Sequence, residues 1–226
     1  MIGFRRLFAT GIAITALGLL LTGCACSASQ PGATQAPAGP KSAVDSFYKA
    51  SSKHGTLTFV SGKEQKQDRI EYWFEGDRYR LTWFNEDGSV RIHMISPDGK
   101  TVYNCYAKDQ VSKLSYVRAE FHQAIFNGPE GWTLDAGVPD GDLTAYTYVA
   151  KKLWTVTGSS QDFYLEDLVV YADDTRIVKA IARTDSSKPD DPSDLVTSRY
   201  EFDPPELGVS IPAEKFELPW KIVPAE

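Results

Sequence analysis

The chain has 226 residues, a formal net charge of -6 and 42% hydrophobic residues, with 11 Tyr, 11 Phe and 5 Trp among them. This length fits one domain with an ample apolar core, and the negative charge argues against nucleic acid as a partner, because phosphate backbones bind basic surfaces. Three cysteines, Cys24, Cys26 and Cys105, are too few for the disulfide framework of small secreted domains. Cys26 and Cys105 are a conceivable pair, but Cys26 lies in a flexible leader, so we expect Cys105 to be a buried free thiol.

The N-terminal residues have the layout of a bacterial export signal. Arg5 and Arg6 form a positive start, and residues 7–21 are apolar or small. This run is shorter than the roughly 20 apolar residues of a membrane-spanning helix. The sequence Leu21-Thr-Gly-Cys24 then resembles the lipobox of bacterial lipoproteins, in which a small residue precedes the cysteine that receives the lipid.

The lipobox resemblance implies that residues 1–23 are a signal peptide and that mature Cys24 carries a diacylglyceryl group and fatty acids such as palmitate. The chain would then be lipid-anchored at the extracytoplasmic face of a cell membrane. The alternative is an ordinary secretory signal that is cut between Ala25 and Ser29. The order of basic residues, apolar run and small residues before cysteine favours the lipobox.

Residues 24–41 have no apolar periodicity and are rich in Pro, Gly, Ala and Ser. This composition predicts a flexible tether that holds the folded part near the lipid surface. The folded domain is therefore expected over residues 42–226. Without Arg5 and Arg6 its formal charge becomes -8, which suits a protein that stays in solution beside a membrane.

The domain is expected to begin with a helix and continue with strands. Val44, Phe47 and Tyr48 lie at helical spacing, which predicts a helix from Ser42, its N-cap, to about Ser52. From Thr56 onward the apolar residues alternate with polar ones, the period of a half-buried strand.

A hairpin with one apolar face is the clearest element. Its first strand places Ile70, Tyr72 and Phe74 on one side, and its second strand repeats the pattern after Gly76-Asp77 with Tyr79, Leu81 and Trp83. Turn residues at 85–88 and 97–99 then delimit two more strands, Val90–Ile95 and Thr101–Tyr106. Together these segments predict an antiparallel meander.

A second helix and a second meander follow. Val117, Phe121 and Ile125 lie four residues apart and Asn127-Gly-Pro129 is a helix stop, which predicts a helix over Val117–Phe126. The later strands are expected at Thr144–Ala150, Leu153–Thr157, Phe163–Tyr171, Arg176–Thr184 and Leu195–Phe202. The proline-rich tail after Phe202 should run extended over the domain, with Phe216, Leu218 and Trp220 tucked in.

Motifs for catalysis and for metal or cofactor binding are absent from the sequence. There is no nucleophile elbow, phosphate loop or zinc-protease motif. His54, His93 and His122 lie on three different expected elements without ligands at metal-binding spacing. We therefore expect a non-enzymatic protein without a metal or cofactor.

One set of apolar residues is the candidate binding site. These residues are expected to share one face of the sheet: Tyr72, Phe74, Tyr79, Leu81, Trp83, Met94 and Tyr103. If helices fill this face, the stripe is ordinary core. If the helices act only as a partial lid, the same residues line an apolar groove suited to acyl chains.

Several segments resemble the lipoprotein-carrier superfamily, which has a LolA-like fold. They are Trp73, Gly76 and Arg80, then Ile95-Ser-Pro-Asp-Gly-Lys-Thr-Val-Tyr103, then Tyr200-Glu-Phe202 and Ile211-Pro-Ala-Glu-Lys-Phe-Glu-Leu-Pro219. The resemblance spans roughly residues 42–219. It implies a mainly β, α+β fold: one curved antiparallel sheet, a half-barrel, with helices across its concave face and an apolar cavity between them.

Two differences from the soluble carriers bear on function. The chain lacks their Arg-Pro dipeptide, reading Gly76-Asp-Arg-Tyr-Arg-Leu-Thr-Trp83 instead, and it has a lipobox of its own. These differences favour an anchored lipid binder, acceptor or sensor over a shuttling carrier. The leading hypothesis is thus a membrane-anchored binder of a lipid or acyl chain in lipid or lipoprotein trafficking. The alternative is a cell-surface sensory or interaction module, with an envelope protein as partner and no ligand cavity.

Overall fold

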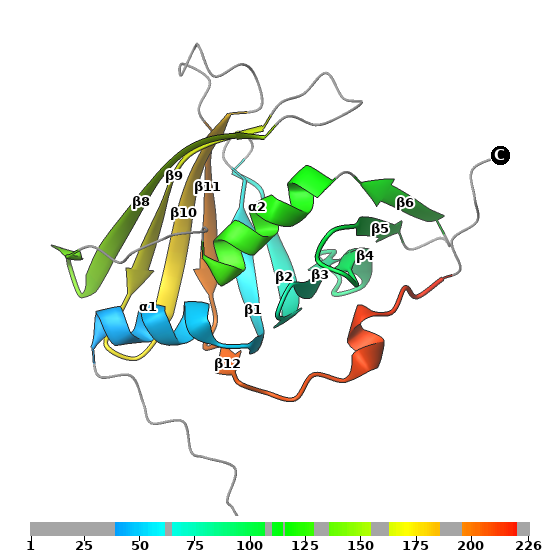
Figure 1. Ribbon diagram of the computed structural model, residues 1–226, viewed down its shortest axis with the longest axis horizontal. Helices are drawn as coiled ribbons and strands as arrows, with labels where there is room; N and C mark the ends of the chain where they lie inside the picture. The colour runs from blue at the N-terminus through cyan, green and yellow to red at the C-terminus, as the bar shows by residue number, and fades with distance from the viewer. Residues whose placement is uncertain are drawn as a thin grey trace, which may run out of the picture. The chain divides into compact units, whose positions relative to one another are not determined.

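One antiparallel sheet of 12 strands dominates the fold, and two short α-helices lie against it (Figure 1). The computed structural model describes residues 39–61, 65–106, 110–114, 116–128, 136–154, 163–185 and 196–220. All of them belong to one compact unit, Ala36–Glu226. The predicted mainly β, antiparallel class is therefore confirmed.

The helices are α1 (Pro40–Lys49) and α2 (Tyr116–Asn127), and a short 3-10 turn, η2, covers Ala213–Phe216. The strands in chain order are β1 (Ser52–Val60), β2 (Gln67–Glu75), β3 (Arg78–Phe84), β4 (Val90–Ser96), β5 (Val102–Tyr106), β6 (Gln110–Leu114), β7 (Val138–Asp140), β8 (Leu143–Trp154), β9 (Phe163–Ala172), β10 (Ile177–Asp185), β11 (Val196–Phe202) and β12 (Glu206–Leu207).

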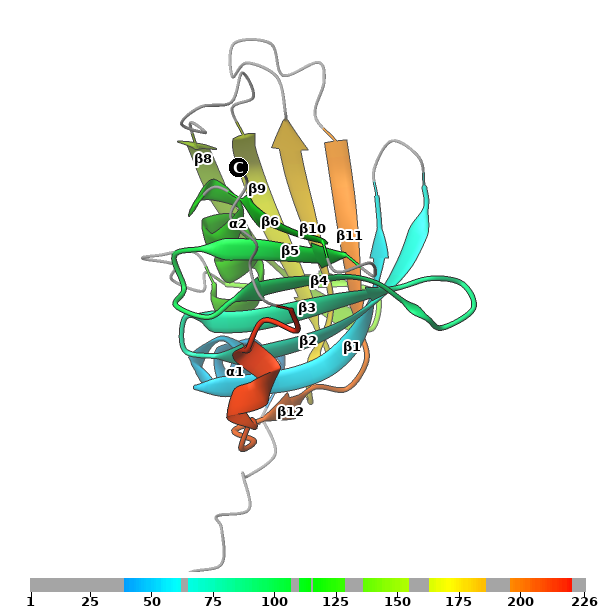
Figure 2. The ribbon, with the colours of Figure 1, turned by 90° about the vertical axis from the view of Figure 1, so that its right-hand side faces the viewer.

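The strands follow the order β6-β5-β4-β3-β2-β1-β11-β10-β9-β8-β7, and β12 pairs with β1 beside this path. Every pairing is antiparallel, which suits connections by short turns. β6 and β7 are the two edges, so the sheet is open among the described strands. Figure 2 shows β2–β5 running across the direction of β9–β11, with β1 beside β11 where the two sets meet.

The predicted hairpin is confirmed as β2 and β3. Gly76 has φ 55°, a left-handed conformation that glycine adopts without strain, and this allows the tight turn at Gly76-Asp77. Across the hairpin, Phe74 lies opposite Tyr79 and Tyr72 lies opposite Leu81. The apolar residues of both strands therefore point to the same face.

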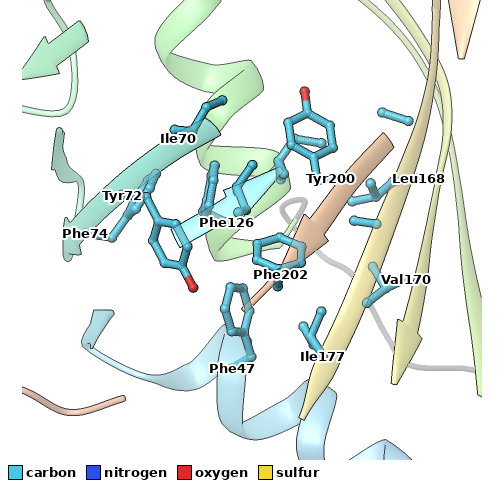
Figure 3. Close-up of a cluster of buried hydrophobic side chains, with 14 of the residues drawn as sticks. Phe47, Ile70, Tyr72, Phe74, Phe126, Leu168, Val170, Ile177, Tyr200 and Phe202 are labelled. Carbon is cyan, nitrogen blue, oxygen red and sulfur yellow. The ribbon is translucent and has the colours of Figure 1, made fainter. Parts of the chain in front are cut away.

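Both helices pack on this apolar face. Phe47 of α1 contacts Phe202 of β11 with ring centroids 5.5 Å apart, and Phe126 of α2 stacks on Phe74 at 4.4 Å. Tyr72 lies between the two helices' contacts, 5.0 Å from Phe126 and 6.1 Å from Phe202. Figure 3 shows these aromatic side chains converging with aliphatic ones from β9 and β10. We call this side of the sheet the core face.

The C-terminal segment covers part of the opposite side, which we call the outer face. Phe216 of η2 is buried, and the guanidinium carbon of Arg78 lies 4.7 Å from the centroid of the Phe216 ring. η2 lies against β3, and Figure 2 shows it on the outside of the sheet. The expectation that Phe216 tucks in is confirmed, and Leu218 and Trp220 are half-buried.

Three predicted boundaries at the start of the domain are wrong: the two ends of the first helix and the start of the first strand. α1 begins at Pro40 with Gly39 as its N-cap, so Ser42 lies inside the helix. Proline presets the helical φ at the first position, which explains the earlier start. The helix ends at Lys49 and not near Ser52. β1 then begins at Ser52 and not near Thr56.

The later strands differ in detail from the prediction. β8 is one long strand where two were expected, and a register shift between Val149 and Lys152 marks the expected break. The short strands β6, β7 and β12 were not predicted. The expected second helix is confirmed as α2, which ends at Asn127.

Candidate functional site

Six of the seven predicted stripe residues share the core face. The pairs Tyr72–Leu81 and Phe74–Tyr79 join β2 to β3, Trp83 lies opposite Ile70, and Met94 lies opposite Leu81. Residues that lie directly opposite each other in a sheet point to one side. The sequence pattern therefore identified a real aromatic face on β2–β4.

Tyr103 does not belong to this face, and its inclusion was wrong. Met94 pairs with Asn104 on the core face. Tyr103 pairs with Ile95, whose side chain points to the outer face. A shift of one residue moves a side chain to the other face of a strand. The position on the core face next to Met94 is thus taken by the amide of Asn104.

The stripe is covered in this structure. Tyr72, Phe74, Tyr79 and Leu81 are at most 1% exposed, and Met94 is 6% exposed. Trp83 is half-buried and packs against the same cluster. The first four residues therefore have the burial of core residues, and any ligand at this face has to displace helix α2 or share its place.

Side-chain hydrogen bonds to turn carbonyls hold the C-terminal end of α2. Gln123 Nε2 donates to Asp77 O at 3.2 Å and to Gly99 O at 3.1 Å, and Asn127 Nδ2 donates to Gly76 O at 3.1 Å. These carbonyls belong to the β2–β3 and β4–β5 turns. This end of α2 is thus fastened to the rim of the sheet rather than to its middle.

Lys53 lies on the core face although it is a lysine. It is 2% exposed, pairs with Phe74, and its Nζ donates to Ala50 O and Asn127 Oδ1, both at 3.0 Å. Burial lowers the pKa of Lys53 from 10.5 to about 8, because a charged ammonium loses its hydration. The Lys53 side chain therefore donates hydrogen bonds to residues at the C-terminal ends of both helices.

The core face also holds polar atoms that have no hydrogen-bond partner among the described residues. They are Tyr72 Oη, Tyr79 Oη, Ser96 Oγ and Asn104 Oδ1. Burial raises the pKa of Tyr72 and of Tyr79, so both phenols stay neutral and keep a proton to donate. Buried polar atoms are nearly always paired in proteins, which makes these four unusual.

A polar groove of about 860 Å³ lies on the outer face. Thr56 and Thr58 of β1 and Arg69 and Glu71 of β2 form its floor, and the β3–β4 turn at 85–88 forms one wall. The sequence analysis missed it because these residues alternate with the core ones, a pattern that predicts ordinary solvent-facing positions. Their mixed charges, gathered beside a turn, were the available signal.

A second polar cluster on the outer face lies next to the C-terminal segment. His54 stacks on Trp73 with ring centroids 3.5 Å apart, and Lys215 Nζ lies 4.4 Å from the Trp73 ring centroid. His54 also lies 3.1 Å from Glu206 and 3.4 Å from Glu71. The cluster thus joins β1, β2 and the C-terminal segment.

His93 and Cys105 lie beside this cluster. Arg80 Nη2 donates to His93, and burial together with the Arg80 charge lowers the pKa of His93 to about 4. Cys105 is buried, as expected, and burial raises the pKa of its thiol to about 11. The imidazole and the thiol are therefore both neutral near pH 7, and an unionised thiol is a poor nucleophile.

The described residues contain no group of three His, Cys, Asp or Glu side chains that fits a metal ion. Within the same ranges, no helix has the length and apolar character needed to cross a membrane. Cys24 lies outside the described residues. Among the described residues, the core face and the outer groove are the two candidate binding surfaces.

No family model matches the chain, and no curated protein matches it either.

Proposed function

We propose that the chain is a membrane-anchored lipoprotein, attached through Cys24, that binds a lipid or acyl chain between the sheet and its two helices. In this proposal the open sheet is the half-barrel of the lipoprotein-carrier superfamily, and its concave side is the core face. Tyr72, Phe74, Leu81 and Trp83 form the apolar wall. Each buried methylene contributes about 0.8 kcal/mol to binding.

The observation that carries this proposal is the way the aromatic face is closed. Two short helices cover it instead of a second sheet, and the described end of α2 is fastened by side chains to three turn carbonyls at the rim. In this proposal α2 swings out as a unit while the sheet keeps its hydrogen bonds. The aromatic face would then be free for an alkyl chain, as expected of a mostly apolar ligand site.

Native mass spectrometry of the full chain, purified from its membrane, tests the proposal. We expect a non-covalent lipid mass that is present under native conditions and lost on denaturation. The lipid on Cys24 is covalent and should survive denaturation, so the same sample contains its own control. A chain that carries only the covalent lipid, and that binds no added lipid, would contradict the proposal.

The outer groove favours a second candidate, a cell-surface interaction module on the same fold. The groove carries both charge signs, with Arg69 and Lys66 beside Glu71 and Glu86, which suits a polar protein partner better than an alkyl chain. A photo-crosslinking residue at Phe84, in the groove, should give one discrete adduct in intact cells. The same residue at Lys49, 75% exposed on α1, is the control and should give none.

A further inference from the structure

Three polar groups on the core face that have no hydrogen-bond partner in the described part of the chain belong to neighbouring residues of the sheet. Tyr79 on β3 pairs directly with Ser96 on β4, and Asn104 on β5 pairs with Met94, two residues from Ser96 on the same face. Their exposed fractions are 0%, 0% and 4%. We call Tyr79, Ser96 and Asn104 the polar triplet.

Tyr72 Oη likewise has no hydrogen-bond partner among the residues that the structure describes, but its surroundings are different. Its Oη points at Gly55 on β1, where a Cβ atom would lie only 2.6 Å away. The absence of a side chain at Gly55 thus accounts for the room that this hydroxyl occupies. This hydroxyl therefore points toward β1 and is not part of the triplet on β3–β5.

The triplet lies in an apolar wall beneath α2. Phe74 stacks on Tyr79 with ring centroids 5.2 Å apart, and Leu81 and Met94 lie next along the face. His122 of α2 contacts the edge of Tyr79 at 6.0 Å. A few polar groups set in an apolar wall are typical of a ligand site, and unpaired buried polar groups are destabilising unless a partner arrives.

The chemistry of the triplet selects the partner. The Tyr79 phenol donates a hydrogen bond, Asn104 Oδ1 accepts one, and the Ser96 hydroxyl does both. None of the three carries a charge, and an ionised group buried there would lose its hydration without compensation. The complementary ligand group therefore has an acceptor oxygen and a hydroxyl or amide donor, and no net charge.

We infer that the polar triplet is a hydrogen-bonding subsite for the uncharged ester-and-hydroxyl or amide head of an acyl ligand, whose alkyl chain lies along Phe74, Leu81 and Trp83. This inference rests on the proposed function and adds the chemical class of ligand head that the site selects. The subsite discriminates against free carboxylate and phosphate heads. It also explains why polar side chains persist at positions where apolar ones would pack without unpaired atoms.

The test uses the full chain in lipid nanodiscs with three radiolabelled probes of equal alkyl chain: a monoacylglycerol, the fatty acid and the alkene. Empty nanodiscs give the background. We expect the wild type to prefer the monoacylglycerol. Tyr79→Phe and Asn104→Leu should each reduce that preference over the alkene about fivefold, the loss of one neutral hydrogen bond. Thr82→Val, which removes a buried hydroxyl opposite His93 on the outer face of β3, should leave the preference unchanged.

Thermal unfolding without probe separates binding from stability. Tyr79→Phe keeps the stacked ring and removes an unpaired hydroxyl, so its unfolding midpoint should equal or exceed that of the wild type. If all three probes bind but Tyr79→Phe and Asn104→Leu keep the wild-type preference, the subsite is refuted and the lipid binder stands. If Thr82→Val loses as much preference, the triplet is refuted as well. If no probe binds, the proposed function fails together with the subsite.

Discussion

Lys53 Nζ lies 3.0 Å from Asn127 Oδ1, a contact that joins the first strand of the sheet to the last residue of α2. The same ammonium donates to Ala50 O just after α1. Both acceptors lie at helix C-termini, where the helix dipole favours positive charge. Burial disfavours the charged ammonium, whereas the two helix C-termini favour it. The protonation of Lys53 therefore depends on a balance between these two electrostatic effects.

We predict that this balance makes stability depend on pH. Lys53 has a pKa of about 8 in the folded chain against 10.5 for an exposed lysine. Between these pH values Lys53 is protonated in the unfolded chain and neutral in the folded one, so the free energy of unfolding rises with pH. Below about pH 8 Lys53 is protonated in both states, and this gain in stability is absent. At about 1.4 kcal/mol per pKa unit, the full gain is on the order of 3 kcal/mol.

Urea unfolding of the wild type and of Lys53→Met, below pH 8 and up to about pH 10, measures this dependence. The stability difference between them should move in favour of the wild type as pH rises. The variant cancels the contributions of other groups that titrate in this range. A constant difference would show that Lys53 keeps an ordinary pKa.

A second prediction concerns Gly55. Its missing Cβ would lie 2.6 Å from Tyr72 Oη and 2.9 Å from Tyr72 Cζ. Because Tyr72 is 0% exposed, its ring cannot move away freely. Gly55→Ala should therefore destabilise the fold by about 1–3 kcal/mol, the usual range for overpacking.

Tyr72→Phe supplies the matching control for Gly55→Ala. Tyr72→Phe removes the nearest atom, Oη, but leaves Cζ. Gly55→Ala should therefore destabilise the fold less in the Tyr72→Phe background than in the wild type, but should still destabilise it. A double-mutant cycle measured by chemical denaturation gives the coupling energy. Strictly additive losses would mean that the two residues do not meet in the folded chain.

The sequence predicted the elements that depend on local pattern. Period-two apolar spacing and a glycine turn were sufficient for the β2–β3 hairpin, because its two-residue connection leaves one register. The connection between β4 and β5 is longer, and the alternation within each strand does not say which residues oppose each other. Tyr103 was therefore placed on the wrong face, although its strand was correct.

The candidate site was less predictable because its unusual features depend on long-range contacts. Lys53 and Asn104 read as solvent-facing residues in the sequence, and their burial follows from the helices that cover them. Ser96 precedes a proline and reads as part of a turn. Only the strand register places it beside Tyr79.

A third prediction compares Phe126 with Trp83. Phe126 is 1% exposed and contacts three aromatic rings, so Phe126→Ala should cost about 3–5 kcal/mol of stability. Trp83 is half-buried, so Trp83→Ala should cost clearly less and should weaken binding of a fluorescent acyl probe to the still-folded chain. Circular dichroism and probe titration of the same samples measure both effects. An equal stability loss in both variants would assign Trp83 to the core.

The last prediction concerns the anchor. If the lipobox resemblance holds, the Cys24 thiol is the attachment point, and cells grown with labelled palmitate should incorporate label into the wild-type chain. Cys24→Ala has no thiol at that position and should remain unlabelled, while Cys26→Ala, two residues away, should label normally and controls for general effects on export. Fluorography after denaturing electrophoresis detects the covalent lipid free of bound ligand. Label retained in Cys24→Ala would rule out this anchor and with it the membrane attachment on which the proposed function depends.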